Sequence, residues 1–279
     1  MIQAIDHIII AVENLDHAET NYKKIFGVDP VWRGKHKELG TKNSLFNLQN
    51  TYLELLAADG EGLGAELVKN QINEKGDGLI GIVYAVEEIE SFRNKLIQAG
   101  YLISEIAQGK GENIQNDKKR VWKNLFLPEE LTKGLFAFII EHSEGKLDIL
   151  DHFPHSSVHR LDHVVINTKN GDDFIKVYRD LFGIRLALDK VIKHWKKRIL
   201  FFRVNKTTIE VIEDSGKENE SDELWGLAWE VKSLEEMHKR LKEEGVEYTP
   251  IKKGLKEGTL VSTIKSHTHN VPTLVIENT

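Results

Sequence analysis

The sequence of 279 residues contains no cysteine. Disulfide bonds, zinc sites built from thiolates and catalysis by a cysteine nucleophile are therefore excluded, and the chain is compatible with a reducing compartment. Long apolar runs are also missing. The apolar stretch at residues 8–12 is far shorter than the roughly 20 residues that cross a bilayer, and no basic segment precedes it. We therefore expect a soluble, cytoplasmic protein that does not enter membranes.

An excess of positive charge is absent as well. The chain has 38 Lys and Arg against 44 Asp and Glu, a net charge of −6, so nothing overall attracts the phosphates of a nucleic acid. The length suggests one large or two ordinary domains with a substantial core. We expect a small-molecule substrate as the partner, and the composition is compatible with a homodimer.

The strongest internal signal is a repeated strand that carries an Asp-His pair. Residues 5–12 are apolar except for Asp6 and His7, and residues 161–166 repeat this arrangement, with His163 at 156 positions after His7. An imidazole on a buried strand needs a polar partner, so the repeat points to a polar site. If the strand alternates regularly, His7 shares its face with three apolar residues, namely Ile5, Ile9 and Ala11.

A glutamate recurs at the same offset and offers that partner. Glu54 lies on the predicted strand 51–58, and Glu210 follows it by 156 positions. The helical patterns in between also repeat at this offset, and they end at Gly27 and Gly183, where a glycine commonly follows a helix. Each unit is therefore a strand, a helix and three strands, with His on the first strand and Glu on the last.

Two weaker units follow the two strong ones. Gly226 follows Gly81, and Gly245 follows Gly100, by 145 positions each. The sequence therefore predicts an α+β fold of four βαβββ modules that form two paired, cup-shaped mixed sheets. We expect an N-terminal module pair at residues 1–150 and a C-terminal pair at residues 160–279, with connections near 59–77, 143–160 and 214–222.

The modules resemble the vicinal oxygen chelate superfamily, which includes glyoxalase I, extradiol dioxygenases and the fosfomycin- and bleomycin-resistance proteins. Residues 34–43, which end in Gly-Thr-Lys-Asn, lead to Tyr-Leu-Glu-Leu at residues 52–55, and this pair of segments is similar to the glyoxalase-like domain proteins. Residues 138–142 and 152–155 fit the same group. The resemblance implies an isomerase, epimerase or lyase that acts on a small molecule with adjacent oxygens.

The resemblance also implies a divalent metal, with the main site in the cup of the N-terminal pair, whereas the C-terminal pair is either a second site or a degenerate structural half. Imidazole and carboxylate ligands suit Fe(II), Mn(II), Ni(II), Co(II) or Zn(II). The roles that the resemblance assigns are metal ligation by His7, Glu54, His163 and Glu210, catalysis or ligation by Glu141, and lining of the substrate pocket by His36 and Asn43.

The sequence departs from the family pattern at two positions. Several relatives have a second histidine where this chain has Gly81, and the fourth module offers only Gly226 and the late Glu277. An extradiol dioxygenase would need a histidine at position 226, so that reaction is not expected. His36 or His194 can supply a missing imidazole.

Other interpretations stay open. Each His–Glu pair can be a duplicated structural pair without a metal, and the protein can then be a metal-free binding or sequestering module, as in bleomycin resistance, or a scaffold. The basic run at residues 193–198 can attract an anionic substrate or form the solvated tip of a hairpin.

Overall fold

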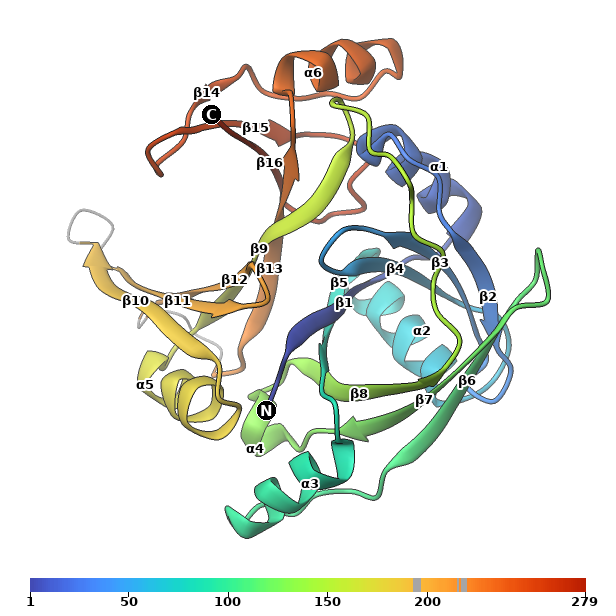
Figure 1. Cartoon of the computed structure of the whole chain (residues 1–279), viewed down its shortest axis with the longest axis vertical. Helices are drawn as coiled ribbons and strands as arrows, with labels where there is room; N and C mark the ends of the chain where they lie inside the picture. Colours follow the sequence, from blue (N-terminus) through green and yellow to red (C-terminus); the bar gives the residue numbers. More distant parts are fainter. Residues whose placement is uncertain (193–196, 215, 217–219) are drawn as a thin grey trace.

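The structure, a computed structural model, describes residues 1–192, 197–214, 216 and 220–279. Its strands form two eight-stranded mixed sheets (Figure 1). The first sheet contains β1 (Ala4–Ala11), β2 (Trp32–His36), β3 (Thr41–Asn47), β4 (Tyr52–Ala58), β5 (Gly78–Ala85), β6 (Ala107–Asn113), β7 (Lys119–Phe126) and β8 (Phe136–Glu144). The second contains β9 (Val158–Thr168), β10 (Arg185–Ile192), β11 (Lys197–Val204), β12 (Thr207–Glu213), β13 (Glu223–Val231), β14 (Lys252–Lys253), β15 (Thr259–Ile264) and β16 (Thr273–Asn278). The helices are α1 (Leu15–Phe26), α2 (Leu63–Lys75), α3 (Ile89–Gln98), α4 (Glu129–Thr132), α5 (Gly171–Ile175), which continues as the π-helical segment η1 (Lys176–Leu181), and α6 (Leu234–Glu243).

Each sheet is built from two modules whose first and last strands lie side by side. β1 pairs in parallel with β4, β5 with β8, β9 with β12 and β13 with β16. The antiparallel pairs β1–β5 and β9–β13 join the modules, so the first module pairs with the second and the third with the fourth. This confirms the predicted α+β fold of four modules in two paired mixed sheets. The division of the chain into residues 1–150 and 160–279 remains a proposal, which the change of sheet between β8 and β9 supports.

Within the described part of the chain, the first sheet closes into a barrel and the second stays open. The barrel order is β1-β4-β3-β2-β6-β7-β8-β5, and the open order is β10-β11-β12-β9-β13-β16-β15-β14. β2 and β6 close the barrel at the register pair Gly34–Asn113. A side chain at Gly34 would overlap the indole of Trp32, and one at Gly109 would overlap the indole of Trp122. Glycine at these positions therefore gives the two indoles the space that they occupy at the closure.

One apolar core runs along the convex faces of both sheets. Ile8 of β1 and Val164 of β9 belong to it, together with the buried sides of α1, α3 and α6. Phe26 of α1 packs edge-on against Trp229 of β13, with ring centroids 4.9 Å apart, so the two sheets share this core. As the sequence predicts, α1 ends at Gly27, which adopts a φ of 70°. No helix of the described residues is long and apolar enough to span a membrane.

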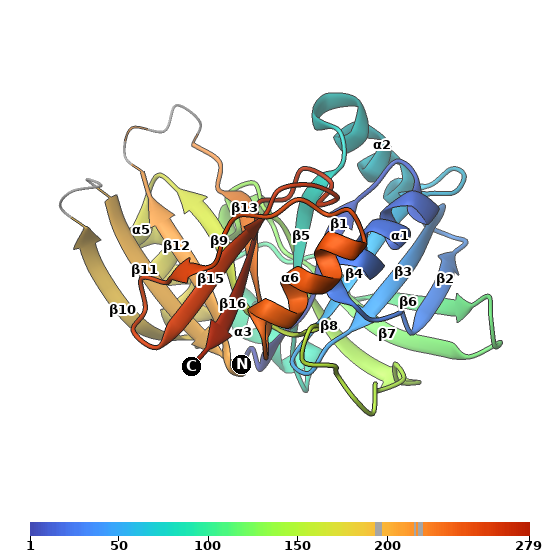
Figure 2. The ribbon, with the colours of Figure 1, turned by 90° about the horizontal axis from the view of Figure 1, so that it is seen from above.

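The segment 59–77, which was predicted to be a connection, contains α2, so the prediction is wrong there. The helix lies across one end of the barrel (Figures 1 and 2), where Val68 and Ile72 join the apolar cluster of the interior residues Ile9 and Val83. Only two residues of α2 are fully buried, so the apolar pattern of this helix is short. Its charged residues therefore made the segment resemble a loop in the sequence. The helix adds apolar side chains to this end of the barrel.

Candidate functional site

The Asp-His pair of β1 lies at a β-bulge. The register against β5 shifts between Ile5 and His7, so that Asp6 is the extra residue. Ile5 packs into the outer core, whereas His7 points into the barrel on the side of Ile9 and Ala11. The expectation that Ile5 shares the face of His7 is therefore wrong, because the bulge interrupts the regular alternation. It also brings the carboxylate of Asp6 to the imidazole.

Inside the barrel, His7 joins two carboxylates in a continuous polar chain. Its Nδ1 lies 2.6 Å from Oδ1 of Asp6, and its Nε2 lies 3.3 Å from Oε2 of Glu54. The Nδ2 of Asn43 donates to Oε1 of Glu54 at 2.7 Å. The ring of Tyr52 stacks on the imidazole at 4.5 Å. His7 and Glu54 are only 4% and 7% exposed, so the pair is fixed by protein groups rather than by water.

The charges of Asp6, His7 and Glu54 stabilise one another. Burial alone would lower the pKa of His7, but the hydrogen bonds and charges of Asp6 and Glu54 outweigh burial and raise it above 6.5. Burial alone would raise the pKa of Glu54, but His7 lowers it below 4.5. The pKa of Asp6 is lowered in the same way by His142, whose Nε2 lies 2.9 Å from Oδ2 of Asp6, and by His7. These shifts favour an imidazolium held between two carboxylates.

His36 faces the same interior, and its surroundings disfavour the protonated form. Burial lowers its pKa below 6.5, and the positive charges of Arg120 and His7 lower it further. Its Nδ1 lies 3.0 Å from Oγ1 of Thr41, and its ring meets Trp122 edge-on at 5.7 Å. His36 and Asn43 therefore lie where a pocket-lining role is predicted for them, and that role remains a proposal.

Arg120 is a buried residue of this interior that the sequence reasoning missed. It follows Asp117, Lys118 and Lys119, so it resembles part of an exposed charged run. Its guanidinium faces the ring of Trp122, two positions later on β7, and this spacing of two residues on one strand face is the signal that could have revealed it.

Glu141 lies on the outer side of the barrel wall. Its Oε2 accepts the backbone N–H of Ile89, the first residue of α3, at 2.7 Å, and its Oε1 lies 3.3 Å from Nζ of Lys123. Its strand neighbour Ile139 belongs to the outer core. The structure therefore does not bring Glu141 to His7 and Glu54, and the predicted catalytic or ligating role stays a prediction that this position does not support.

The strand registers explain this position. In the first module, Tyr52 pairs with His7, and Glu54 pairs with the residue two positions further along β1. In the second module, Phe136 pairs with Gly81, and Phe138 pairs with the residue two positions further along β5. The counterpart of Glu54 is therefore Phe138, three residues before Glu141.

A metal centre of three or more side chains does not fit this barrel. Gly81 has no side chain, and a Cβ there would lie 3.0 Å from Phe136 and 3.1 Å from Ile9. Over residues 1–192, 197–214, 216 and 220–279, no group of three or more His, Asp or Glu side chains is close enough to hold a metal ion. His7 and Glu54 offer two donors, so their ligand role stays a prediction, and no chemical step below depends on a metal.

The position of Glu141 leads to a testable expectation for stability. Glu141→Ala removes the acceptor at the start of α3 and should lower the free energy of unfolding by about 1 kcal/mol, the usual cost of a lost helix cap. Glu141→Gln retains an acceptor oxygen and should lose less. Both variants should bind and convert ligands as the wild type does. Urea unfolding beside an activity assay tests this, and a large loss of activity in Glu141→Gln would restore the catalytic role.

The second cup repeats the His–Glu pair in a weaker form. His163 Nδ1 lies 2.8 Å from Oδ1 of Asp162, again at a bulge, and its Nε2 lies 3.5 Å from Oε2 of Glu210. Ile199 stands 156 positions after Asn43 and offers no amide to the carboxylate. Burial, which outweighs the opposing effect of His163, raises the pKa of Glu210 above 4.5, so this carboxylate is stabilised less than Glu54.

Glu277 repeats the structural role of Glu141. Its Oε2 accepts the backbone N–H of Leu234, the first residue of α6, at 2.7 Å. Like Glu141, it therefore supports the start of a helix on the outer face of its sheet.

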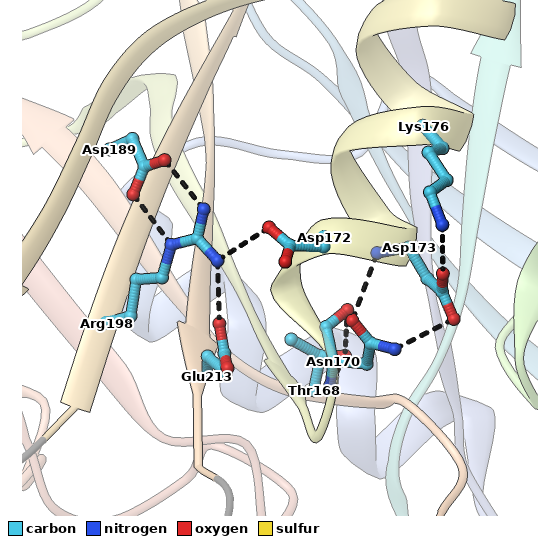
Figure 3. Close-up of polar contacts among 8 residues, drawn as sticks. All are labelled: Thr168, Asn170, Asp172, Asp173, Lys176, Asp189, Arg198 and Glu213. Atoms are coloured by element: carbon cyan, nitrogen blue, oxygen red, sulfur yellow. Dashed lines mark hydrogen bonds and ion pairs between the residues drawn. The ribbon is translucent and has the colours of Figure 1, made fainter.

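Carboxylates surround Arg198 at the end of the basic run. His194 and the rest of residues 193–196 lie outside the described residues. Arg198 makes two hydrogen bonds of 2.7 Å to Asp189 and one of 2.8 Å to Asp172, and it lies 3.3 Å from Glu213 (Figure 3). Its guanidinium is therefore engaged within the protein and is not offered to an anionic substrate.

Comparisons with known proteins agree with this architecture. The family model of the glyoxalase-like domain matches residues 5–186, and that of the glyoxalase/bleomycin resistance protein/dioxygenase superfamily matches residues 162–263. An ethylmalonyl-CoA/methylmalonyl-CoA epimerase from Cereibacter sphaeroides is 32% identical over 102 residues, which cover 36% of this chain and 73% of that protein.

Two solved structures share the fold. A hypothetical protein from Staphylococcus aureus superposes with a TM-score of 0.68 at 14% identity, over 98% of this chain and 99% of that one. The Mn(II)-bound glyoxalase from Novosphingobium aromaticivorans superposes with a TM-score of 0.64 at 16% identity, over 99% of this chain and 82% of that one. With a family model matching more than half of its length, the chain belongs to the glyoxalase-like domain family of the vicinal oxygen chelate superfamily.

Proposed function

We propose that this protein is an isomerase, epimerase or lyase that moves a proton at a carbon next to oxygen-bearing groups of a small molecule. The observation that carries the proposal is the buried chain in which His7 lies between Asp6 and Glu54. Such a chain holds a donor and a base side by side in fixed orientations, which is what proton transfer next to a carbonyl group requires.

Asp6, His7, Glu54 and Asn43 each have a part in this proton transfer. Asp6 accepts from Nδ1 and fixes the imidazole, so that the Nε2–H of His7 points to Glu54. This N–H would donate to the substrate oxygen on which negative charge develops. The carboxylate of Glu54 would take the proton from the adjacent carbon: the C–H bond breaks, an O–H bond forms on Glu54, and the electron pair moves toward the oxygen that faces His7. Asn43 holds the second oxygen of Glu54 during the step.

Substrate binding would make Glu54 a better base. In the free protein, His7 keeps the pKa of Glu54 low, against the effect of burial. A substrate oxygen that accepts the N–H of His7 would replace Glu54 as its partner. Burial would then raise the pKa of Glu54 toward the range in which a general base works well.

Metal dependence, which the resemblance predicts, is a separate part of the proposal. The metal content of protein purified without a chelator, measured for the wild type and for His7→Ala, tests it directly. Stoichiometric metal in the wild type and its loss in the variant would support ligation by His7. Equal, substoichiometric contents would remove the metal from the proposal.

A second candidate function is metal-free binding or sequestration of a small molecule. The observation that favours it is that Gly81 and Phe138 occupy the second module's counterparts of His7 and Glu54, so the second module supplies no further His–Glu pair.

Proton exchange separates the two candidates. NMR in D₂O can follow a panel of 2-oxo and 2-hydroxy compounds together with ethylmalonyl-CoA and methylmalonyl-CoA, the compounds in the name of the bacterial relative. An enzyme is expected to exchange or isomerise at least one compound, and the activity should disappear in a His7→Gln/Glu54→Gln double variant. Tight binding without exchange in the wild type would favour the binding protein.

A further inference from the structure

The barrel contains a buried cation whose hydrogen-bond donors are largely unused. Arg120 is 6% exposed. One of its terminal nitrogens lies 3.5 Å from the hydroxyl of Tyr52 and 3.5 Å from Nδ1 of His142, which is the outer limit for a hydrogen bond. Its Nε is buried and has no hydrogen-bond partner among the described residues. No carboxylate in the described part of the chain forms an ion pair with Arg120.

This state is unusual for a buried arginine, because a buried charge is normally paired. Even Arg198, which is only partly buried, is paired, since its guanidinium contacts three carboxylates (Figure 3). Arg240, also only partly buried, donates from its terminal nitrogens to the backbone carbonyls of Lys24, Ile25 and Ser156. Among the described residues Arg120 has neither kind of acceptor, so its N–H groups lie inside the barrel without a direct carboxylate or carbonyl partner.

Aromatic rings hold Arg120 in place without using its N–H groups. Its guanidinium carbon lies 5.8 Å from the ring centroid of Trp32, 5.3 Å from that of Tyr52 and 5.9 Å from that of Trp122. These distances are in the range of cation–π attraction, which acts on the charge and leaves the donors free. The guanidinium is therefore oriented in advance for an acceptor that the protein does not supply.

Tyr52 links this cation to the reactive pair. Its ring stacks on His7 at 4.5 Å, and its hydroxyl is the group that approaches Arg120. Arg120 and His7 are therefore separated by about one tyrosine side chain. A ligand that contacts both groups would lie beside this tyrosine ring.

We infer that Arg120 binds the carboxylate of the substrate, so that the substrates are small carboxylic acids with an oxygen-bearing carbon beside the acid group. The planar guanidinium matches the two oxygens of a carboxylate and distinguishes acids from neutral analogues. The inference rests on the proposed function for the role of His7 and Glu54, whereas the binding of the acid group depends on Arg120 alone.

Binding measurements on the full chain test this inference. Isothermal titration calorimetry would use pyruvate, lactate and malonate, each beside its neutral amide, with inorganic phosphate as a second anion. The wild type should bind at least one acid, and its amide at least 10-fold more weakly. Arg120→Met should lose about 10- to 100-fold in affinity for the acid, the usual range for a charge-assisted hydrogen bond, and Arg120→Lys should fall in between. Arg203→Met, the same change on the second sheet, should bind as the wild type does.

Stability separates a binding role from a structural one. Because Arg120→Met removes an unpaired buried charge, its unfolding temperature should equal or exceed that of the wild type. A lower unfolding temperature with unchanged acid binding would overturn the inference, as would failure of every acid to bind, or tighter binding of phosphate or of the amides.

The outcomes also distinguish this inference from the proposed function. Acid binding that depends on Arg120, without proton exchange, would overturn the proposed function and leave the inference standing. Exchange on neutral carbonyl compounds that persists in Arg120→Met would overturn the inference and leave the proposed function standing.

Discussion

Glu54→Gln is expected to lower the rate of proton exchange by about 10²- to 10⁴-fold, the usual contribution of a general base. The substitution keeps the shape of the side chain and retains an oxygen that can accept from Asn43. It removes the negative charge that takes the proton, so the chemical step should slow while substrate binding changes little. Single-turnover exchange in D₂O, with ligand affinity measured in parallel, reports these two effects separately.

The internal repeat of the chain supplies a matched control. Glu210→Gln makes the same chemical change at the equivalent position of the second sheet, beside His163. Because Glu210 lacks the amide partner of Glu54 and its pKa is raised rather than lowered, we expect this variant to keep near wild-type exchange. Equal losses in both variants would place activity in both cups. An unchanged rate in Glu54→Gln would remove Glu54 from the mechanism.

The sequence was sufficient to predict the modules and the two His–Glu pairs. The constant offset of 156 residues reflects a duplication, and a duplicated unit retains its pattern of buried and polar positions. His7 and Glu54 meet because the first and last strands of a module pair in parallel. The same rule correctly brought His163 and Glu210 together.

The sequence alone could not give the registers on which the rest of the site depends. The bulge at Asp6 has no compositional signal, because an extra residue in a strand differs from its neighbours only in pairing. The run from Phe136 to Ile140 is continuously apolar, so its alignment with Tyr52 to Leu56 was not fixed, and a glutamate at its end was mistaken for the counterpart of Glu54. Register determines which side of the wall a side chain faces.

Arg120 illustrates a second reason why the sequence alone could not predict the whole site. Its burial depends on the closure of the barrel between β2 and β6, a contact between strands about 75 residues apart that no local pattern encodes. The second sheet contains the same kinds of strands and stays open in its described part, so the modules alone do not dictate closure. The enclosed site is thus a property of the tertiary structure of the first pair.

Replacement of His7 by alanine is expected to destabilise the protein by about 3–5 kcal/mol, the usual cost of removing one partner from a buried charge pair. Asp6 and Glu54 would remain buried without the imidazolium between them. Urea unfolding of the wild type and the variant near pH 6 measures the difference. His163→Ala provides the comparison: the side chain of His163 is 17% exposed, against 5% for His7, so its loss should cost only about 1 kcal/mol.

The pH dependence of this difference tests its electrostatic origin. Because the folded pKa of His7 is raised above 6.5, its contribution to stability is fully present below pH 6.5 and is lost as the pH rises through the raised value. Because the folded pKa of Glu54 is lowered below 4.5, its contribution is present above pH 4.5 and is lost as the pH falls through the lowered value; Asp6, lowered from 3.8, behaves alike. The stability gap between wild type and His7→Ala should therefore be widest between pH 4.5 and 6.5 and narrow on both sides. A gap independent of pH would mean that His7 acts mainly through its packing against Tyr52 and Phe138.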